Sequence, residues 1–349
     1  MNDLTTLLEA ARAEHALSDL HLLSGEPVAR IGGRLRRFGS HWDTATILAD
    51  LERALSDDQR MRLMGRGDVT VRMPGSWGLV RAQYYREQGR TGLAIRFLDE
   101  SPPKFSALDL PPVIEEFAYA GSGLVLFTGP AHAGKSTLKA SLVRSMDERK
   151  MDRHVRIVES PIEWVHSPKS IFVSHVSVGI RADAASYPEA LSSALRSDVQ
   201  ALVIGELFSD DGTILQAAEA AHKGLALYAT MHANSMASAL QMIIDAFPTE
   251  SERRLRQMLA SKFVGGVSLR LVPRSDAVGV IAAAEVTVVN DSIRAMIRSG
   301  DFTSLSAEHE SGALGMQSLE QDLNRLLAQG KISASDARLA AARPDLIVG

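Results

Sequence analysis

The sequence contains no cysteine, which excludes disulfide bonds and thiolate metal sites in this chain. It also lacks any stretch approaching the roughly 20 consecutive apolar residues that a membrane-spanning helix needs. The N-terminal residues MNDLTTLLEAARAEH carry acids early and lack the basic region and apolar run of a signal peptide. With a net charge of -4, the chain has no sign of the basic surface that coats nucleic acid. We therefore expect a cytoplasmic protein that does not bind nucleic acid.

The length of the chain, 349 residues, exceeds what one hydrophobic core usually holds, so two domains are expected. Residues 1–100 combine a predicted helix over residues 3–16, a helical pattern over residues 44–64 and short strand-like runs, which indicates a small α+β domain. The runs cover residues 20–23, 28–31, 69–73, 79–85 and 93–98. Two Pro-Pro pairs within residues 101–113 predict a stiff linker and a domain boundary.

From residue 114 to residue 349 the pattern changes, because short apolar runs alternate with helical stretches. Such alternation is typical of an α/β domain with a mostly parallel sheet and helices on its faces. The strand-like runs cover residues 124–127, 155–158, 171–176, 202–204 and 225–229. The last ~60 residues are predicted to be helical from apolar spacing such as that of Leu319, Leu323 and Leu326.

A glycine-rich loop follows the first of these runs and precedes a helical stretch, the order that a phosphate-binding loop requires. The glycines allow successive backbone N–H groups to point at a phosphate, and the helix start adds its positive dipole end. Lys135 is expected to reach the β- and γ-phosphates of ATP, and Ser136 to ligate Mg²⁺. The alternative, a glycine turn that only caps a helix, is disfavoured by the flanking strand and helix. The loop reads Gly129-Pro130-Ala131-His132-Ala133-Gly134-Lys135-Ser136, with Thr137 next, and His132 is expected to act through its backbone.

Titratable residues follow three further strands of the predicted sheet. Glu159 and Glu163 follow residues 155–158, Glu206 follows residues 202–204, and His232 follows residues 225–229. Because ligands bind outside the carboxyl ends of parallel strands, these groups are expected to face one nucleotide.

We predict that Glu206 positions and deprotonates the attacking water, and that His232 senses the γ-phosphate. Glu159 and Glu163 are expected to hold Mg²⁺ through water or to fix the position of the base, Glu206. The alternatives are a carboxylate that stabilises a helix start for Glu206, solvated loop acids for Glu159 and Glu163, and a structural role for His232.

Two arginines of the N-terminal domain, Arg81 and Arg96, flank an apolar and aromatic segment. An arginine from a neighbouring subunit can neutralise charge in the transition state of phosphoryl transfer. From the residues alone, surface arginines on strands are the simpler interpretation.

Several motifs, in order along nearly the whole chain, resemble those of one known family. The second domain carries GSGLVLFTGPAHAGKST, ESPIEW, ALVIGE and TMHANSMASA. Residues 18–22 (SDLHL) are similar to that family's opening motif, and residues 244–248 (IDAFP) and 315–319 (GMQSL) to its later signatures. On these motifs the chain resembles the twitching-motility branch of the secretion ATPases, the PilT/PilU-like pilus retraction motors.

The resemblance implies a PAS-like N-terminal domain, a RecA-like P-loop ATPase domain and a hexameric ring of identical subunits. By position it implies an acidic box at residues 159–163, a Walker B glutamate at Glu206 and a His-box histidine at His232. It also places Arg81 and Arg96 among N-domain arginines near a nucleotide. The implied work is the conversion of ATP hydrolysis into a domain rotation that disassembles pilin at the inner membrane. The implied partners are a pilus platform protein and a paralogous retraction ATPase. The platform protein would give the chain a peripheral association with the membrane.

The chain departs from the family pattern at three places. Ser160 stands where the acidic box has aspartate, residues 207–210 (LFSD) replace Met-Arg-Asp, and the usual Gly-His is replaced around Gly224-Leu225. Losing a charged group at the site slows hydrolysis by orders of magnitude, whereas binding should survive because the loop is intact.

The leading hypothesis is a hexameric retraction motor, and the departures favour the alternative of a slow accessory nucleotide-binding paralogue. A related assembly or secretion ATPase is disfavoured by the missing tetracysteine zinc insertion that is common in that branch. A nucleic-acid translocase is disfavoured because the sequence has no basic stripe.

Overall fold

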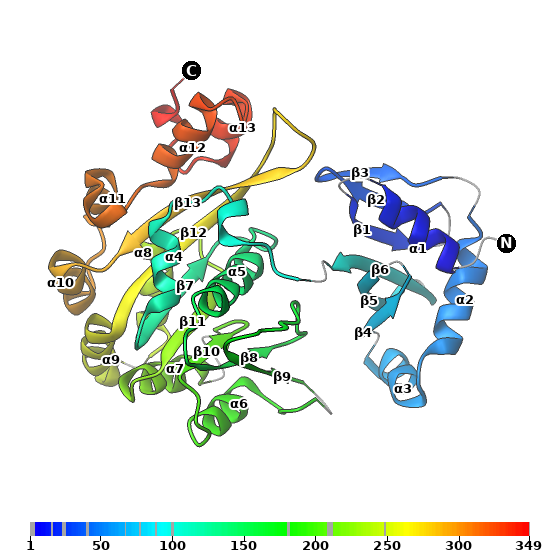
Figure 1. Ribbon diagram of the computed structural model, residues 1–349, viewed down its shortest axis with the longest axis horizontal. Coiled ribbons are helices and arrows are strands. Elements are labelled where there is room, and N and C mark those ends of the chain that lie inside the picture. The colour runs from blue at the N-terminus through cyan, green and yellow to red at the C-terminus, as the bar shows by residue number, and fades with distance from the viewer. Residues whose placement is uncertain are drawn as a thin grey trace. The chain divides into compact units, whose positions relative to one another are not determined.

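The computed structural model describes residues 4–14, 17–22, 26–39, 42–66, 68–76, 78–87, 89–98, 101–179, 182–207, 212–247 and 249–348. The chain divides into two compact units, one of Met1–Glu100 with Ala277–Val280 and one of Ser101–Asp276 with Ile281–Gly349 (Figure 1). Among the predicted features, residues 3, 15 and 16 of the first helix, residue 23 of the first strand and residues 208–210 lie outside the described residues.

The N-terminal unit contains one antiparallel sheet and three helices. The six strands follow the order β3-β2-β1-β6-β5-β4. Its elements are α1 (Leu4–Ala13), β1 (Leu17–Leu22), β2 (Val28–Ile31), β3 (Arg34–Arg37), α2 (Thr44–Ala54), α3 (Asp57–Arg66), β4 (Asp68–Gly75), β5 (Gly78–Glu87) and β6 (Arg90–Leu98). Leu7, Leu20, Leu51 and Leu93 belong to a single core that joins the helices to the sheet. The predicted small α+β domain is therefore confirmed.

Strand β3 was not predicted from the apolar pattern. Its four residues, RLRR, are all exposed, and β3 lies at the edge of the sheet. An edge strand that packs on no core needs no apolar alternation, and charged side chains there prevent pairing with another chain. Because β3 is an exposed edge strand, it lacks the alternation of apolar and polar residues by which a strand is usually recognised in a sequence.

The second unit is built on a seven-stranded sheet with the order β13-β12-β7-β11-β10-β8-β9. Its strands are β7 (Gly123–Thr128), β8 (His154–Glu159), β9 (Phe172–Ser177), β10 (Ala201–Ile204), β11 (Ala226–Met231), β12 (Phe263–Pro273) and β13 (Val280–Val288). All strands from β12 to β9 in this order run parallel. The predicted α/β class with a mostly parallel sheet is confirmed, and all five strands expected in this region are present.

The strands β12 and β13 were missed by the sequence pattern. Glycine inside a run weakens a strand signal, and β12 contains both Gly265 and Gly266. A Cβ at Gly265 would lie 2.4 Å from the carbonyl oxygen of Thr287, and one at Gly266 would lie 2.4 Å from Cε of Met236. The glycines therefore allow β12 to approach β13 and the start of α8 (Met236–Asp245) closely.

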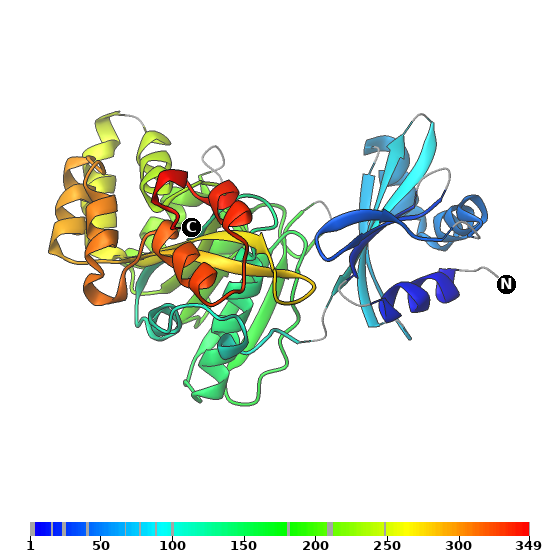
Figure 2. The ribbon, with the colours of Figure 1, turned by 90° about the horizontal axis from the view of Figure 1, so that it is seen from above.

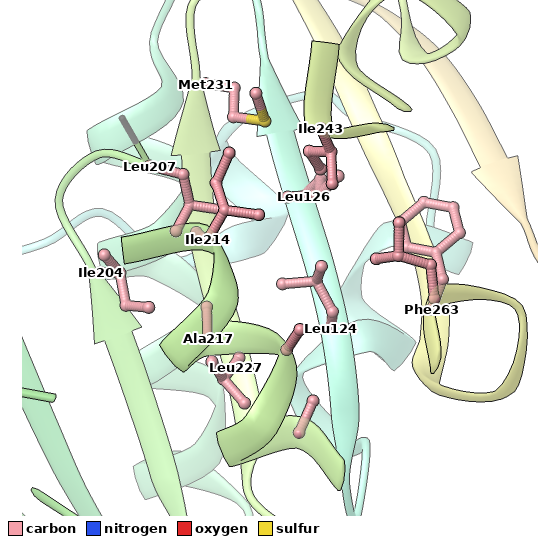
Figure 3. Close-up of a cluster of buried hydrophobic side chains, with 14 of the residues drawn as sticks. Leu124, Leu126, Ile204, Leu207, Ile214, Ala217, Leu227, Met231, Ile243 and Phe263 are labelled. Carbon is pink, nitrogen blue, oxygen red and sulfur yellow. The ribbon is translucent and has the colours of Figure 1, made fainter. Parts of the chain in front are cut away.

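Helices cover both faces of this sheet. Leu124 and Leu126 of β7 belong to one buried cluster with Ile243 of α8 (Figure 3), whereas Val125 and Phe127 belong to a second cluster with residues of α5. Because alternate side chains of a strand point to opposite faces, β7 is apolar at consecutive positions. The helices of this unit are α4 (Val113–Glu116), α5 (Lys135–Glu148), α6 (Tyr187–Ala194), α7 (Thr213–His222), α8 and α9 (Thr249–Lys262), followed by α10 (Asp291–Ser299), α11 (Leu305–Ser311), α12 (Leu319–Ala328) and α13 (Ala334–Ala340).

The C-terminal region is helical, as the apolar spacing predicted, and runs from α10 to α13 (Figure 2). Ser318 caps α12, where its side chain accepts from the backbone of Gln321 while the Gln321 side chain accepts from the backbone of Ser318. Gln317 forms an antiparallel bridge with Val286 of β13, so residues 315–319 fasten α12 to the sheet. Within the described ranges, no helix combines the length and the apolar character needed to span a membrane.

Candidate functional site

The glycine-rich loop lies at the carboxyl end of β7, between that strand and α5. Gly129 has a φ of 140° and Gly134 a φ of 92°, both in the left-handed region that favours glycine. A Cβ at Gly129 would lie 2.6 Å from the carbonyl oxygen of Leu269 in β12, so only glycine fits there. Gly134 is the N-cap of α5, and the unpaired N–H groups of the first helical turn therefore lie at the end of the loop.

Lys135 is a nearly buried cation, with 8% of the residue exposed. Its Nζ donates hydrogen bonds of 2.7 Å to the carbonyl oxygens of Gly129 and Pro130. Burial lowers the pKa of Lys135 to about 8, although the negative charge of Glu206 acts to raise it. The two hydrogen bonds of 2.7 Å from this ammonium go to uncharged carbonyl groups, so a phosphate in the loop would supply negative charge beside it. The loop therefore fits a nucleotide.

The structure brings Glu206 and His232 together beside Lys135. His232 Nε2 lies 3.2 Å from Oε1 of Glu206, and His232 Nδ1 lies 3.5 Å from Lys135 Nζ. The His232 side chain is 50% exposed and that of Glu206 is 29% exposed, so both can meet water and a ligand. Of the residues predicted at the strand ends, these two and the loop lysine form one continuous polar chain.

The strand ends that carry these two side chains are tied to each other. The Thr230 hydroxyl in β11 donates to the carbonyl oxygen of Gly205, and the N–H of Leu207 donates to the Thr230 carbonyl over 2.9 Å. The segment that holds Glu206 is thus fixed to the strand that leads into His232.

Glu159 ends β8 and lies in a buried polar cluster with a residue that we did not predict. Its Oε1 lies 3.2 Å from Nζ of Lys139 in α5, and its Oε2 accepts a hydrogen bond of 3.1 Å from the N–H of Glu163. Lys139 also donates to the carbonyl oxygen of Ile204 over 3.1 Å. Ser136, Lys139 and Glu159 line one small cavity. The signal that was available is the position of Lys139, a charge on the buried side of a helix, beside Leu138 and Leu142.

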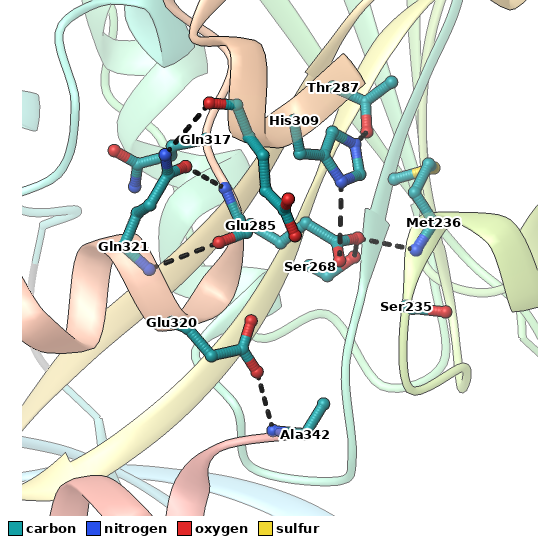
Figure 4. Close-up of polar contacts among 12 residues, drawn as sticks. Ser235, Met236, Ser268, Glu285, Thr287, His309, Gln317, Glu320, Gln321 and Ala342 are labelled. Atoms are coloured by element: carbon teal, nitrogen blue, oxygen red, sulfur yellow. Dashed lines mark hydrogen bonds and ion pairs between the residues drawn. The ribbon is translucent and has the colours of Figure 1, made fainter. Parts of the chain in front are cut away.

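A second unpredicted residue, the acid Glu285 of β13, holds three segments near the loop (Figure 4). Its Oε1 accepts hydrogen bonds of 2.8 Å from the Ser268 hydroxyl and from the N–H of Met236, the first residue of α8. The hydroxyl of Thr128, the residue before the loop, donates to Ser268 over 2.8 Å. Glu285 therefore connects the base of the phosphate loop to the helix that follows His232.

His309 of α11 completes this network and is a structural residue. Its Nε2 lies 2.7 Å from the hydroxyl of Thr287, and its Nδ1 lies 3.8 Å from Oε2 of Glu285. Burial lowers the pKa of His309, although the charge of Glu285 acts to raise it. The C-terminal helices are thus joined to the strand that supports the loop.

Known proteins share the sequence pattern of this chain. The family described as type II/IV secretion system protein matches residues 53–333. The chain is 31% identical to the type IV pilus retraction ATPase PilT of Pseudomonas aeruginosa, over 98% of this chain and 99% of that protein. The chain belongs to the type II/IV secretion system family. The chain is also 30% identical to the type IV pilus ATPase PilU of Pseudomonas aeruginosa, over 74% of this chain and 67% of that protein.

The fold of this secretion system protein is similar to that of a solved relative. The crystal structure of the pilus retraction motor PilT with bound ADP has a TM-score of 0.84 and 29% identity, over 98% of each chain. The chain is therefore a PilT-like nucleotide-binding ATPase with a RecA-like domain, and the resemblance drawn from its motifs is confirmed.

Two predicted site residues of this PilT-like ATPase belong to the N-terminal unit. Arg81 and Arg96 are register partners on β5 and β6. Nε of Arg96 donates to Oδ1 of Asp19 over 2.8 Å. Burial acts to raise the pKa of Asp19, but the hydrogen bond and charge of Arg96 outweigh it and lower that pKa. Arg96 thus has a structural partner within its own unit, in the SDLHL motif.

The three departures from the secretion ATPase pattern have different structural contexts. Ser160 follows Glu159 directly, so the acidic box retains the carboxylate at the end of β8. Leu207 is a buried core residue, 5% exposed, and residues 208–210 lie outside the described part of the chain. Gly224, with a φ of 103°, makes the turn between α7 and β11.

Proposed function

We propose that this PilT-like ATPase works as a homo-hexameric motor that hydrolyses Mg·ATP to drive pilus retraction. The observation that carries the proposal is the chain of Lys135, His232 and Glu206 at the end of a glycine-rich loop. Relatives whose names describe pilus retraction and twitching motility support the retraction role.

Each residue of the site has a proposed task. The N–H groups of residues 129–137 and the Lys135 ammonium bind the phosphates. Glu206 accepts a proton from the attacking water, and His232 orients Glu206 or hydrogen-bonds the γ-phosphate. Ser136 would hold Mg²⁺, with Glu159 and Glu163 behind it, and the metal would neutralise phosphate charge.

The proposal also includes contributions from outside the subunit. Arg81 and Arg96 supply positive charge to a nucleotide of a neighbouring subunit, in keeping with their adjacent positions on β5 and β6. The motor works in the cytoplasm, where ATP is available, and reaches the inner membrane through a pilus platform protein. A paralogous retraction ATPase is a further partner.

Hydrolysis and assembly test the proposal together. Wild-type protein should hydrolyse ATP above background, and Glu206→Gln should abolish hydrolysis while it still binds ADP. Size measurement with ATP should give six subunits, and a monomer under all conditions would remove the intersubunit roles of Arg81 and Arg96. If wild type and Glu206→Gln both bind nucleotide but hydrolyse at background, the chain is the slow accessory paralogue instead.

A further inference from the structure

Lys139 is a buried charge on the helix that begins at the phosphate loop. It lies one helical turn after Lys135 and three residues after Ser136, and its side chain is 2% exposed. Apolar side chains of Val143, Ile157 and Val203 line the same small cavity. A buried ammonium in such surroundings is costly unless a carboxylate pairs with it, and here the carboxylate is Glu159.

Both carboxylate oxygens of Glu159 are occupied. Oε1 faces Lys139 Nζ at 3.2 Å, and Oε2 accepts from the N–H of Glu163 at 3.1 Å. Glu159 is nevertheless the acid that shares a cavity with Ser136. A Mg²⁺ ion bound to a nucleotide would be attracted to a carboxylate in this place, either as a direct ligand or through water. The pair of Lys139 and Glu159 carries no net charge, so that attraction is cancelled.

The positive charge of Lys139 reaches the phosphate site. Burial has the largest effect in lowering the pKa of Lys135 to about 8, and the like charge of Lys139 acts in the same direction. Lys139 also donates to the carbonyl oxygen of Ile204, the last residue of β10, two residues before Glu206. One ammonium group therefore contacts the acidic box and the strand that carries the proposed base.

We propose that Lys139 is an internal counter-ion of the acidic box, which occupies Glu159 and thereby weakens Mg²⁺ binding and slows ATP hydrolysis in this chain. The inference rests on the proposed nucleotide site and assigns Lys139 a positioning role, because it acts on the metal through Glu159. It adds a further cause of slow turnover to the departures at Ser160 and residues 207–210.

The test compares Lys139→Met and Lys139→Gln with wild type. Methionine keeps the length of the side chain and removes the charge, and glutamine also keeps a donor for Glu159 and Ile204. Lys150→Met is the matched control, since Lys150 is an exposed lysine just beyond the same helix. Circular dichroism establishes that each variant is folded.

Metal binding is measured directly, with Mn²⁺ as the probe, because carboxylate and water ligands suit Mn²⁺ as they suit Mg²⁺. Loss of the free Mn²⁺ paramagnetic resonance signal gives the Kd in ADP-saturated protein. Both Lys139 variants should bind Mn²⁺ about 10- to 100-fold more tightly than wild type, because each removes a unit positive charge close to the proposed site of a divalent cation. Their ATP turnover should rise, and Lys150→Met should match wild type. An unchanged Kd, or weaker Mn²⁺ binding in the variants, would overturn the inference.

Wild-type protein provides a second measurement, which holds even if the variants fail to fold. Excess Mg²⁺ in place of EDTA should tighten ADP binding by no more than about tenfold, a coupling free energy of about 1.4 kcal/mol, and a larger gain would contradict a neutralised acidic box. Lys135→Ala separates this inference from the proposed function. If Lys135→Ala binds ADP as tightly as wild type, the nucleotide site itself is wrong. If ADP binding depends on Lys135 while the Lys139 variants keep the wild-type metal Kd, only the role of Lys139 fails.

Discussion

Replacing Glu285 should show how far the phosphate loop depends on a side chain outside it. The carboxylate accepts hydrogen bonds of 2.8 Å from the Met236 N–H and the Ser268 hydroxyl, and its side chain is 14% exposed. A hydrogen bond to a charged group contributes about 1.5–3 kcal/mol, and a buried donor left without a partner is costly. Glu285→Ala should therefore lower the free energy of unfolding by about 3–5 kcal/mol. Glu285→Gln keeps an acceptor oxygen and should cost about 1–2 kcal/mol.

Thermal unfolding followed by circular dichroism measures this difference. At about 2–4 °C per kcal/mol for a unit of this size, Tm should fall by roughly 6–20 °C in Glu285→Ala and by a few degrees in Glu285→Gln. Glu310→Ala is the control, since Glu310 pairs with Arg343 at 2.6 Å on the surface, and an exposed ion pair contributes about 0–1 kcal/mol. If Glu285→Ala melts within about 1 °C of wild type, the network does not stabilise the fold and the reasoning is refuted.

Three further outcomes follow from the site and the N-terminal unit. Lys135 must be protonated to bind phosphate and has a pKa of about 8 without ligand, so ADP affinity should be constant below that pH and fall above it. Calorimetry should show proton uptake on ADP binding above that pH, and Lys135→Arg should remove the pH dependence of ADP affinity. If Lys135→Arg loses ADP affinity above that pH as much as wild type does, Lys135 is not the titrating group. Gly129→Ala would place a Cβ 2.6 Å from the Leu269 carbonyl oxygen and should abolish ADP binding, and binding at wild-type affinity would show that the loop is not so confined. Arg96→Ala should lower Tm by a few degrees through loss of the Asp19 pair, as a half-buried ion pair contributes about 1 kcal/mol, and should shift the acid unfolding limb because Asp19 then regains a higher pKa. An unchanged acid limb would mean that Arg96 does not hold Asp19 ionised.

Features that depend on neighbours in the chain were predictable. The phosphate loop is a run of consecutive residues between a strand and a helix, and the glycines, lysine and serine act largely through local backbone geometry. Glu206 and His232 were also located, because parallel strands bring their carboxyl ends to the same edge of a sheet. The pairing of these two side chains at 3.2 Å follows from that rule only after the order β7-β11-β10 is known.

Features that depend on distant partners were not predictable. Lys139 and Glu159 are separated by 20 residues, and Glu285 meets Met236 across 49 residues. The position of Lys139 on the apolar side of α5 indicates a buried charge, but nothing local to it identifies Glu159 as the partner. Strand β12 was missed because the glycines that allow its close packing also weaken the local signal of a strand.

The charged groups around the loop differ in their access to water, and this difference separates their tasks. A carboxylate that takes a proton from water must be reachable, and the Glu206 side chain is 29% exposed beside a half-exposed His232. Lys139 and Glu159 expose 2% and 8% of their side chains and neutralise each other. Because this pair is out of contact with water, its effect on a bound nucleotide would be electrostatic. The exposed pair of Glu206 and His232 is thus suited to the chemical step, and the buried pair of Lys139 and Glu159 to setting the rate of that step.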